Sequence, residues 1–378
     1  MKPIYLDNAA TTPIDKEVID VMYQSMIDNN GNPSSTHQFG RKAKSSIETA
    51  RKNIAKHFNV SASEIIFTAS GTEADNLILF NAVTNLGVKR IITSKIEHHA
   101  VLHTVDYLKK TYGTEVVYLH IDEFGSVDIN QLEQLLANEN SSKTLVSLLF
   151  VNNEVGNILP MKKVAEVCKQ YDAYFHSDTV QGIGYFDLDL QEIPVDFIVA
   201  SAHKFHGPKG VGFAFFRKGI GIQPILHGGE QEKGARSSTE NVHSILGMEK
   251  ALDLALKNRV EKKHKIEELK SYFIKELKSN FSDIDFNGLS ADLEKSSYKV
   301  LSVRFPVENS MLLFSLDLAG IAVSGGSACQ SGSSKGSHVL QAFLNDEDAK
   351  KTSIRFSFSK YTTYEELDIT IQKLKELL

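Results

Sequence analysis

Between residues 64 and 216, short apolar runs alternate with stretches that have the spacing of amphipathic helices. The runs predict seven strands, at 64–68, 90–94, 115–119, 144–151, 173–177, 197–200 and 212–216. Helices fit between most of them, at 73–86, 100–111, 129–137 and 162–171. This alternation predicts an α/β fold with a mostly parallel sheet between layers of helices. Such sheets bind ligands at the carboxyl ends of their strands, so side chains at those ends are the first candidates for a site.

A change of pattern near residue 256 predicts a second domain. A long helical pattern runs from about Val242 into the charged segment 258–265. Shorter strands are then expected at 299–305 and 353–359, and a last helix from Tyr364. We therefore predict a large α/β domain over residues 14–255, and a smaller α+β domain made of residues 1–13 and 256–378 that carries the segment around Cys329.

The composition argues against several classes of protein. The formal net charge is −5 and no long basic run occurs, so no direct nucleic-acid partner is expected. No apolar stretch approaches the ~20 residues of a membrane span. The first seven residues lack the apolar core of a signal peptide. Two cysteines in 378 residues do not make a disulfide framework. We therefore expect a cytoplasmic protein with no membrane partner.

Two of the predicted strands end in side chains of opposite charge. The run 197–200 is followed by Lys204 and then by glycine turns. A lysine at the end of a buried strand has a partly desolvated amine, which lowers its pKa and makes it nucleophilic. The run 173–177 ends at Asp178. Pyridoxal phosphate needs this pair, because a lysine binds it covalently and an acid faces its pyridine nitrogen.

Polar side chains at other strand ends each have two interpretations. Gly71 and Thr72 lie in a turn between a strand and a helix, where free N–H groups make either a phosphate cradle or an ordinary N-cap. Asn153 follows an apolar strand and is either a ligand donor or a turn former. Gln181 follows the acidic strand end by three residues and is within reach of the same ligand. His98 either stacks on an aromatic cofactor or lies on the surface at a helix start.

Several further side chains are also ambiguous. Arg355 interrupts an apolar strand, where an arginine is poorly tolerated unless it is paired. It is either a clamp for a substrate carboxylate or half of an internal salt bridge. Arg236 and Thr239 lie in a polar loop and suit either an anion contact or solvent exposure. His99 and His103 have a spacing that can hold zinc, but no nearby set of ligands completes such a site.

The two cysteines have different surroundings. Cys168 shares a helical face with Val164 and Tyr171, which predicts a thiol in the core. Cys329 lies in the Gly- and Ser-rich segment 324–334, where no apolar periodicity occurs. It is either a reactive cysteine on an exposed loop or a chance cysteine in a flexible one.

Taken together, these residues resemble those of one family. The chain is similar to the cysteine desulfurases of the NifS/IscS-like group, within the fold-type I pyridoxal-phosphate enzymes. The resemblance extends over nearly the whole chain, and it implies a large domain with a mostly parallel seven-stranded sheet between helices. The matching segments are Tyr5-Leu6-Asp7-Asn8-Ala9-Ala10-Thr11-Thr12-Pro13, Gly31-Asn32-Pro33-Ser34-Ser35, Glu97-His98, Asn152-Asn153-Glu154, Asp178 with Gln181, Ser201 with His203-Lys204, Ser327-Ala328-Cys329, Ser337-His338-Val339-Leu340 and Arg355-Phe356-Ser357.

The resemblance implies roles around the ring of pyridoxal 5'-phosphate. Lys204 would bind the cofactor covalently and then move protons. Asp178 would pair with the pyridinium nitrogen. His98 would stack on the ring and relay a proton, and Gln181 and Asn153 would contact the oxygen side of the ring.

It also implies a set of phosphate contacts. Gly71, Thr72, Ser201 and His203 would hold the phosphate of the cofactor in their own subunit. Thr239 would reach the phosphate in the neighbouring subunit, which implies a homodimer.

For the reaction, the resemblance implies that L-cysteine is the substrate and L-alanine the product. Arg355 would clamp the substrate carboxylate, with Asn153 beside it. Cys329 would attack the substrate sulfur and carry it away as a persulfide. The sulfur would pass to an acceptor or to an iron–sulfur scaffold protein, for cluster assembly or for thiolation of tRNA and cofactors. Cys329 is then also a candidate for a transient iron–sulfur ligand.

Two positions depart from the family pattern, and other functions stay open. Ser238 stands where the family often has glycine, and Gly336 where proline often precedes Ser-His-Val-Leu. The nearest alternatives are a selenocysteine lyase and an aminotransferase, the second of which needs no Cys329. A catalytically silent scaffold that docks sulfur-transfer partners is an alternative of another class.

Overall fold

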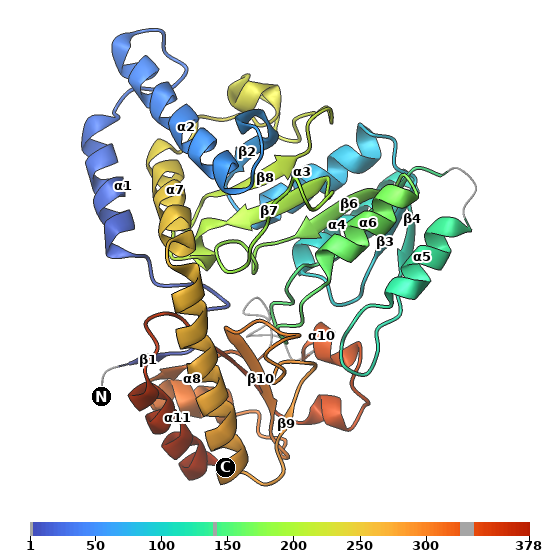
Figure 1. The fold of residues 1–378 in the computed structure, drawn as a ribbon, viewed down its shortest axis with the longest axis vertical. Coiled ribbons are helices and arrows are strands. Elements are labelled where there is room, and N and C mark those ends of the chain that lie inside the picture. The colour runs from blue at the N-terminus through green and yellow to red at the C-terminus, as the bar shows by residue number, and fades with distance from the viewer. Residues whose placement is uncertain (1–2, 139–141, 326–335) are drawn as a thin grey trace.

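The predicted strands form one sheet in the upper part of the molecule (Figure 1). Its strands are β2 (Ile65–Thr68), β3 (Arg90–Thr93), β4 (Glu115–Tyr118), β5 (Thr144–Ser147), β6 (Tyr174–Asp178), β7 (Phe197–Ser201) and β8 (Gly212–Phe216). The computed structural model describes residues 3–138, 142–325 and 336–378. The strand order is β2-β8-β7-β6-β5-β3-β4, and β8 alone runs antiparallel to its neighbours. The mostly parallel seven-stranded sheet is therefore confirmed.

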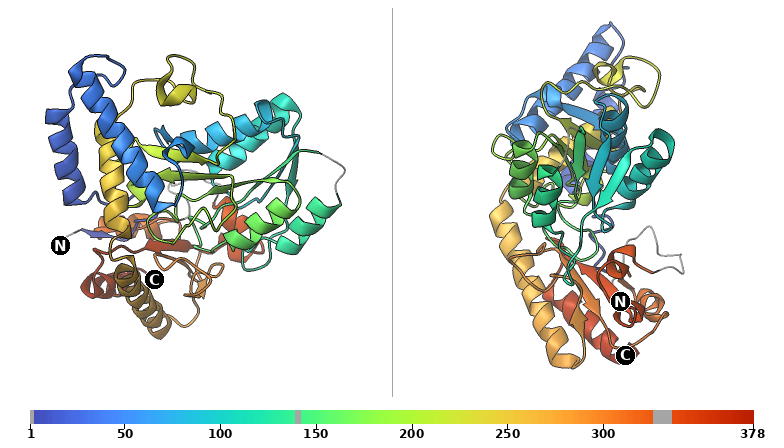
Figure 2. Two further views of the ribbon diagram at one scale, coloured as in Figure 1. Left: turned by 45° about the horizontal axis from the view of Figure 1, so that its top comes forward. Right: turned by 90° about the vertical axis from the view of Figure 1, so that its right-hand side faces the viewer.

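Helices cover both faces of this sheet (Figure 2). Successive strand residues point to opposite faces. On β7, Phe197 and Val199 pack in the cluster that contains α3 and α4, while Ile198 and Ala200 pack in the cluster that contains α2, α5, α6 and α7. The strands are apolar on both faces for this reason. The bounds are α1 (Lys16–Asp28), α2 (Gln38–His57), α3 (Gly71–Thr84), α4 (His99–Tyr112), α5 (Ile129–Ala137), α6 (Met161–Gln170) and α7 (Val242–Leu256).

The lower part of the molecule holds two small sheets and further helices (Figure 1). One sheet has the order β12-β10-β9 and the other pairs β1 with β11. The predicted strands at 299–305 and 353–359 and the helix from Tyr364 are confirmed by β10, β12 and α11. The bounds are β1 (Ile4–Tyr5), β9 (Asp285–Phe286), β10 (Val300–Arg304), β11 (Ile321–Ala322), β12 (Ser353–Ser357), α8 (Arg259–Asn280), α9 (Leu312–Leu318), α10 (His338–Gln341) and α11 (Tyr364–Leu377). Among the described residues, no helix has both the length and the apolar character that a bilayer crossing requires.

Two segments differ from the sequence prediction. The helical pattern that starts at Val242 is two helices, because Asn258 adopts a φ of +54° between α7 and α8. A left-handed residue cannot continue a right-handed helix. The strand expected at 144–151 ends at Ser147, although the Phe150 N–H still donates to the Asp178 carbonyl. The division into domains at residues 13/14 and 255/256 stays a prediction.

The N-terminal segment joins the two parts of the molecule. The Leu6 N–H donates to the carbonyl of Ala322 in β11. The Ala9 N–H donates to Ser357 Oγ at the end of β12, at 2.8 Å. These contacts place the carbonyls of Ala9 and Ala10 next to Lys204, just after the end of β7.

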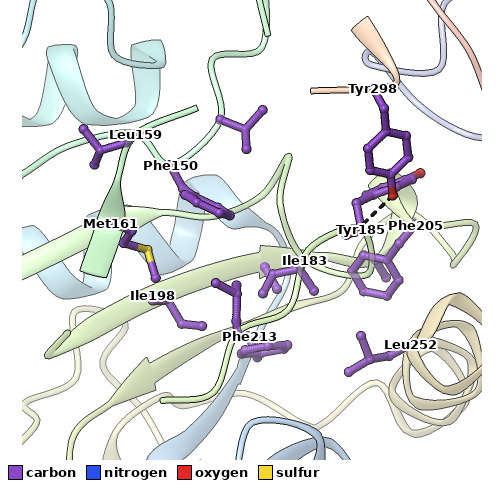
Figure 3. Packing of buried hydrophobic residues seen from close by; sticks show 14 of the residues in the cluster. Phe150, Leu159, Met161, Ile183, Tyr185, Ile198, Phe205, Phe213, Leu252 and Tyr298 are labelled. Carbon is purple, nitrogen blue, oxygen red and sulfur yellow. Dashed lines mark hydrogen bonds between the residues drawn. The ribbon is translucent and has the colours of Figure 1, made fainter. Parts of the chain in front are cut away.

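Aromatic side chains also connect the lower part to the large sheet. Figure 3 shows Tyr298 and Tyr185 side by side. Tyr298 Oη donates to the Tyr185 carbonyl at 3.0 Å, and Tyr185 Oη donates to the Lys204 carbonyl at 2.8 Å. The backbone at the end of β7 is thereby fixed by a side chain that packs against the lower part of the molecule.

A buried ion pair between α2 and the loop before α7 leads to a stability prediction. Arg51 makes a bidentate contact with Glu232, with N–O distances of 2.6 and 2.8 Å. Both side chains are buried, and the guanidinium lies 4.4 Å from the centre of the Phe67 ring. Arg51→Met would leave the Glu232 carboxylate buried and unpaired. We expect this change to lower the free energy of unfolding by about 3–5 kcal/mol, as measured by urea denaturation.

The double variant Arg51→Met with Glu232→Leu is the matched control. It removes both charges, so it is expected to recover most of the loss. A single variant as stable as the wild type would show that the pair is not holding α2 against the loop before α7.

Candidate active site

A cavity of about 230 Å³ lies at the carboxyl ends of β6 and β7, beside the start of α3. It contains nearly all of the side chains that the sequence singled out. Its lining includes Gly71, Thr72, His98, Asn153, Asp178, Gln181, Ser201, His203, Lys204 and Arg355. Two predicted residues are not part of this lining. Thr239 is exposed in the loop before α7, and Cys329 lies outside the described residues.

Lys204 is the last residue of the short helical turn η2 (Ala202–Lys204), which directly follows β7. Its Nζ donates to the carbonyls of Ala9 and Ala10, at 2.7 and 2.8 Å. The amine is therefore held at the cavity wall by two neutral acceptors. A primary amine in this position can form a covalent bond to a carbonyl ligand and can transfer protons.

Asp178 is the last residue of β6 and is only 4% exposed. Burial raises its pKa to about 6, while the Val180 N–H, at 2.9 Å from Oδ1, and the charge of Lys204 act in the opposite direction. A buried carboxylate that makes no ion pair with the described residues favours a ligand with a protonated nitrogen.

His98 is the N-cap residue of α4, and its Nδ1 accepts a hydrogen bond from the Ala100 N–H at 3.2 Å. Burial lowers the pKa of His98 to about 4, and the nearby charges of Lys204 and of two further histidines add to this effect. The ring is therefore neutral at pH 7. Because Nδ1 accepts, the ring proton is on Nε2.

The start of α3 has the N-cap that the sequence suggested, while the phosphate cradle at Gly71 and Thr72 stays a prediction. Ser70 is the N-cap, since its side chain accepts from the Glu73 N–H at 3.2 Å. Gly71 and Thr72 nevertheless line the cavity, so the free N–H groups of the first turn lie beside it. A Cβ at Gly71 would lie 2.7 Å from Val180 Cγ2, so a larger residue would displace this wall.

For Arg355, the internal salt bridge is confirmed, and its role as a clamp for a substrate carboxylate stays a prediction. Its Nη2 forms an ion pair with Asp7 at 2.8 Å, and its Nη1 donates to the Asn153 carbonyl at 2.8 Å. The side chain is 2% exposed, yet it lines the cavity. Its Nε has no hydrogen-bond partner in the part of the chain that is described. An internal salt bridge thus positions a cationic side chain at the cavity wall.

The donor set fits pyridoxal phosphate. An amine, a buried acid and a helix N-terminus meet in one cavity, which matches the aldehyde, the pyridine nitrogen and the phosphate of that cofactor. Gln181 supports this fit, because its Nε2 donates to the Ala9 carbonyl at 2.8 Å while its Oε1 is buried with no hydrogen-bond partner among the described residues.

Asp75 also lines the cavity, although none of the sequence motifs above includes it. Asp75 comes one helical turn after Gly71, so the i, i+4 spacing could have placed it on the same face of α3. The backbone acceptors for Lys204 could not be found in this way, because the contact spans 195 residues.

Other expectations met mixed outcomes. Cys168 is 1% exposed within the core, as expected, and burial raises the pKa of its thiol. Arg236 is not a free anion site, because its guanidinium pairs with Glu73 at 2.7 Å. Ser238, which stands where the family often has glycine, adopts a φ of +92°. This conformation strains a residue that has a Cβ and therefore constrains the loop that carries Thr239.

The chain is similar to known proteins over nearly its whole length. The profile of the family described as Aminotransferase class-V matches residues 4–370. The chain is 42% identical to cysteine desulfurase IscS of Dictyoglomus turgidum, covering all of this chain and 95% of that protein. It is 40% identical to putative cysteine desulfurase IscS 1 of Bacillus subtilis, covering 100% and 99% of the two chains. A solved NifS-like protein superposes with a TM-score of 0.90 at 37% identity, covering 99% of each chain.

Proposed function

The chain belongs to the class-V aminotransferase family and is a cysteine desulfurase that depends on pyridoxal phosphate, and we propose that it converts L-cysteine into L-alanine while passing the sulfur to Cys329. The observation that carries the proposal is the meeting of Lys204 and Asp178 in one cavity. The names of the relatives favour this activity over a selenocysteine lyase or an aminotransferase.

Three side chains are proposed to act around the cofactor ring. Bound pyridoxal phosphate supplies an electron sink for bond changes at the substrate Cα. Lys204 would hold the cofactor and would then take and return a proton at the substrate. Asp178 would keep the pyridine nitrogen protonated. His98, which is neutral, would lie against the ring and relay a proton through its Nε2.

The phosphate contacts and the dimer are proposed together. Gly71, Thr72, Ser201 and His203 would hold the phosphate, supported by their place in the cavity lining. Thr239 is exposed and is not part of that lining. This exposure is compatible with our proposal that it contacts the phosphate site of a second subunit in a homodimer.

Arg355 and Asn153 are proposed to bind the substrate carboxylate. The planar guanidinium of Arg355 suits a carboxylate, which it can contact with two N–H groups. Asp7 and the Asn153 carbonyl hold two of its nitrogens, which fixes its orientation. The substrate is thereby expected to enter with its Cα close to Lys204.

The sulfur step is proposed for Cys329, which lies outside the described residues. The Cys329 thiolate would attack the substrate sulfur, and an S–S bond would form while the C–S bond breaks. The electron pair of that bond would stay with the substrate carbon, which gains a proton to give alanine. The persulfide would pass to an acceptor or iron–sulfur scaffold protein, with Cys329 as a transient iron–sulfur ligand. We place this thiol chemistry in the reducing cytoplasm.

The test is to purify the protein, record its visible spectrum, add L-cysteine with a reductant, and measure alanine and sulfide together. The wild type is expected to be yellow and to form the two products in equal amounts. Cys329→Ala is expected to lower both rates, whereas Cys168→Ala, a change in the core, is the matched control and should retain both. Alanine formation that continues without Cys329 would exclude the sulfur relay, and a colourless protein would exclude the bound cofactor.

A further inference from the structure

Two buried acids lie close together at the base of the cavity. Asp75 from α3 and Asp178 from β6 are 1% and 4% exposed. With His98 they form a group whose nitrogen and carboxylate oxygen atoms all lie within 4.8 Å of one another. Two carboxylates at this separation in a buried site cannot both ionise easily. The groups around Asp75 and Asp178 therefore determine which of the two carboxyls is ionised.

His176 lies behind Asp75 and supplies a partner for it. His176 and Asp178 are two residues apart on β6, so they point to the same face of the sheet. His176 Nε2 lies 3.3 Å from Asp75 Oδ1, and both atoms are buried without a hydrogen-bond partner among the described residues. On the other side of the ring, His176 Nδ1 lies 2.9 Å from Ser147 Oγ of β5. His176 and Ser147 are fully buried.

The groups around the two acids differ in what they favour. Asp178 faces the Val180 N–H and the amine of Lys204, which both favour its ionised form. Asp75 faces the ring of His176 and the two other carboxyls, Asp178 and Glu97. Burial and these two like charges raise the pKa of Asp75 well above its ordinary value.

The remaining neighbours do not supply a cation to Asp75. Glu97 comes from the segment before α4, and burial raises its pKa to about 8 although Ser94 Oγ donates to it at 2.6 Å. Burial lowers the pKa of His176 to about 3, so its ring is neutral at pH 7. His98 is neutral as well. Because the His176 ring is neutral, a proton shared by Asp75 Oδ1 and His176 Nε2 would belong to the carboxyl group of Asp75.

We propose that Asp75 is a positioning residue that stays protonated and donates its hydrogen bond to Nε2 of neutral His176, so that Asp178 alone would carry the negative charge offered to the pyridine nitrogen. In this arrangement His176 carries its proton on Nδ1 and donates it to Ser147 Oγ. The inference rests on the proposed function, since it assigns the cofactor nitrogen to Asp178. Beyond that assignment, the inference gives the buried pair Asp75 and His176 the role of keeping Asp178 ionised.

The variants that test the proposal change the donor or the acceptor of the hydrogen bond between Asp75 and His176. Asp75→Asn keeps a donor toward His176 and carries no charge, so affinity for pyridoxal phosphate is expected to stay within about twofold of the wild type. His176→Leu removes the acceptor, so the protonated Asp75 would donate its hydrogen bond to Asp178 instead. Asp178 would then be a weaker acceptor for the pyridine nitrogen. We expect cofactor affinity to fall about tenfold. His176→Gln offers Oε1 as an acceptor and is expected to restore most of the affinity.

Two readouts decide the question. Cofactor affinity is measured by titrating the cofactor-free protein with pyridoxal phosphate and following visible absorbance, with circular dichroism as a check of folding. The ring of His176 is observed by ¹⁵N NMR on histidine-labelled, cofactor-free protein, with His176→Gln providing the assignment. The expected result is a neutral ring with its proton on Nδ1 at pH 7.

A proton on Nε2, a cationic ring, or a tenfold or greater loss of affinity in Asp75→Asn would overturn the proposal, since each would mean that Asp75 is ionised. The NMR readout needs neither cofactor nor turnover. A wild type that fails to bind pyridoxal phosphate would therefore refute the proposed function, while the state of the Asp75–His176 pair would still be measured.

Discussion

Replacing Lys204 with alanine is expected to lower the rate of alanine formation from L-cysteine by about 10²- to 10⁴-fold. The Lys204 amine is the described basic group that reaches the cavity from the end of β7, and the Ala9 and Ala10 carbonyls fix its position. Without it, no positioned amine would take a proton from the substrate or return one. The rate is measured under single-turnover conditions, with the protein saturated in pyridoxal phosphate, so that weaker cofactor binding does not obscure the chemical step.

Two control variants separate the causes of this loss. Lys204→Arg keeps a positive charge, but an arginine does not give up its proton at physiological pH, so this variant is expected to be as slow as Lys204→Ala. Lys209→Ala removes an exposed lysine from the turn that follows and should leave the rate unchanged. Full activity in Lys204→Arg would mean that the side chain acts through its charge alone. A wild-type rate in Lys204→Ala would refute its catalytic role.

The sequence was sufficient to predict those site residues that lie at the ends of strands. Asp178 and Lys204 each follow an apolar run, and parallel strands bring their carboxyl ends to one edge of the sheet, so their meeting could be anticipated. The same reasoning placed Gly71 and His98 at helix starts. Periodicity and the position of a strand end are local properties of the sequence, which is why they were sufficient here.

What the sequence could not predict depends on contacts between distant segments. The Ala9 carbonyl meets Lys204 across 195 residues, and no pattern marks a backbone acceptor. From the sequence, Arg355 suits a clamp and a salt bridge equally, and only the packing shows that it pairs with Asp7 at the wall of the cavity. The break at Asn258 depends on a single left-handed residue within a continuous polar pattern. The roles of Thr239 and Cys329 stay predictions.

Asp178→Asn is expected to have opposite effects on chemistry and on stability. An amide cannot offer a negative charge to a protonated pyridine nitrogen, so the stabilisation of charge that develops in the transition state is lost. We expect kcat/KM for L-cysteine to fall by about 10²- to 10³-fold, comparable to the loss of one preorganised electrostatic contact. Cofactor affinity is expected to fall as well, which visible absorbance during a titration would show.

The stability of the cofactor-free protein is expected to change in the other direction. Burial raises the pKa of Asp178 from its usual 3.8 to about 6, so the folded state prefers the neutral acid. The stability that this preference contributes is fully present below about pH 4 and is lost as the pH rises through about 6. The amide that replaces this acid in the variant stays neutral at every pH. Above about pH 6 the variant is therefore expected to be more stable than the wild type, by up to about 3 kcal/mol.

Urea denaturation of both cofactor-free proteins at several values of pH between about 4 and 8 measures this difference. The gap between the two is expected to open as the pH rises from about 4 to about 6 and to stay constant above that range. A gap that stays closed would mean that burial does not disfavour the ionised form of Asp178 in the folded protein. A variant that gains stability and loses turnover would show that Asp178 is kept for the cofactor at a cost to the fold.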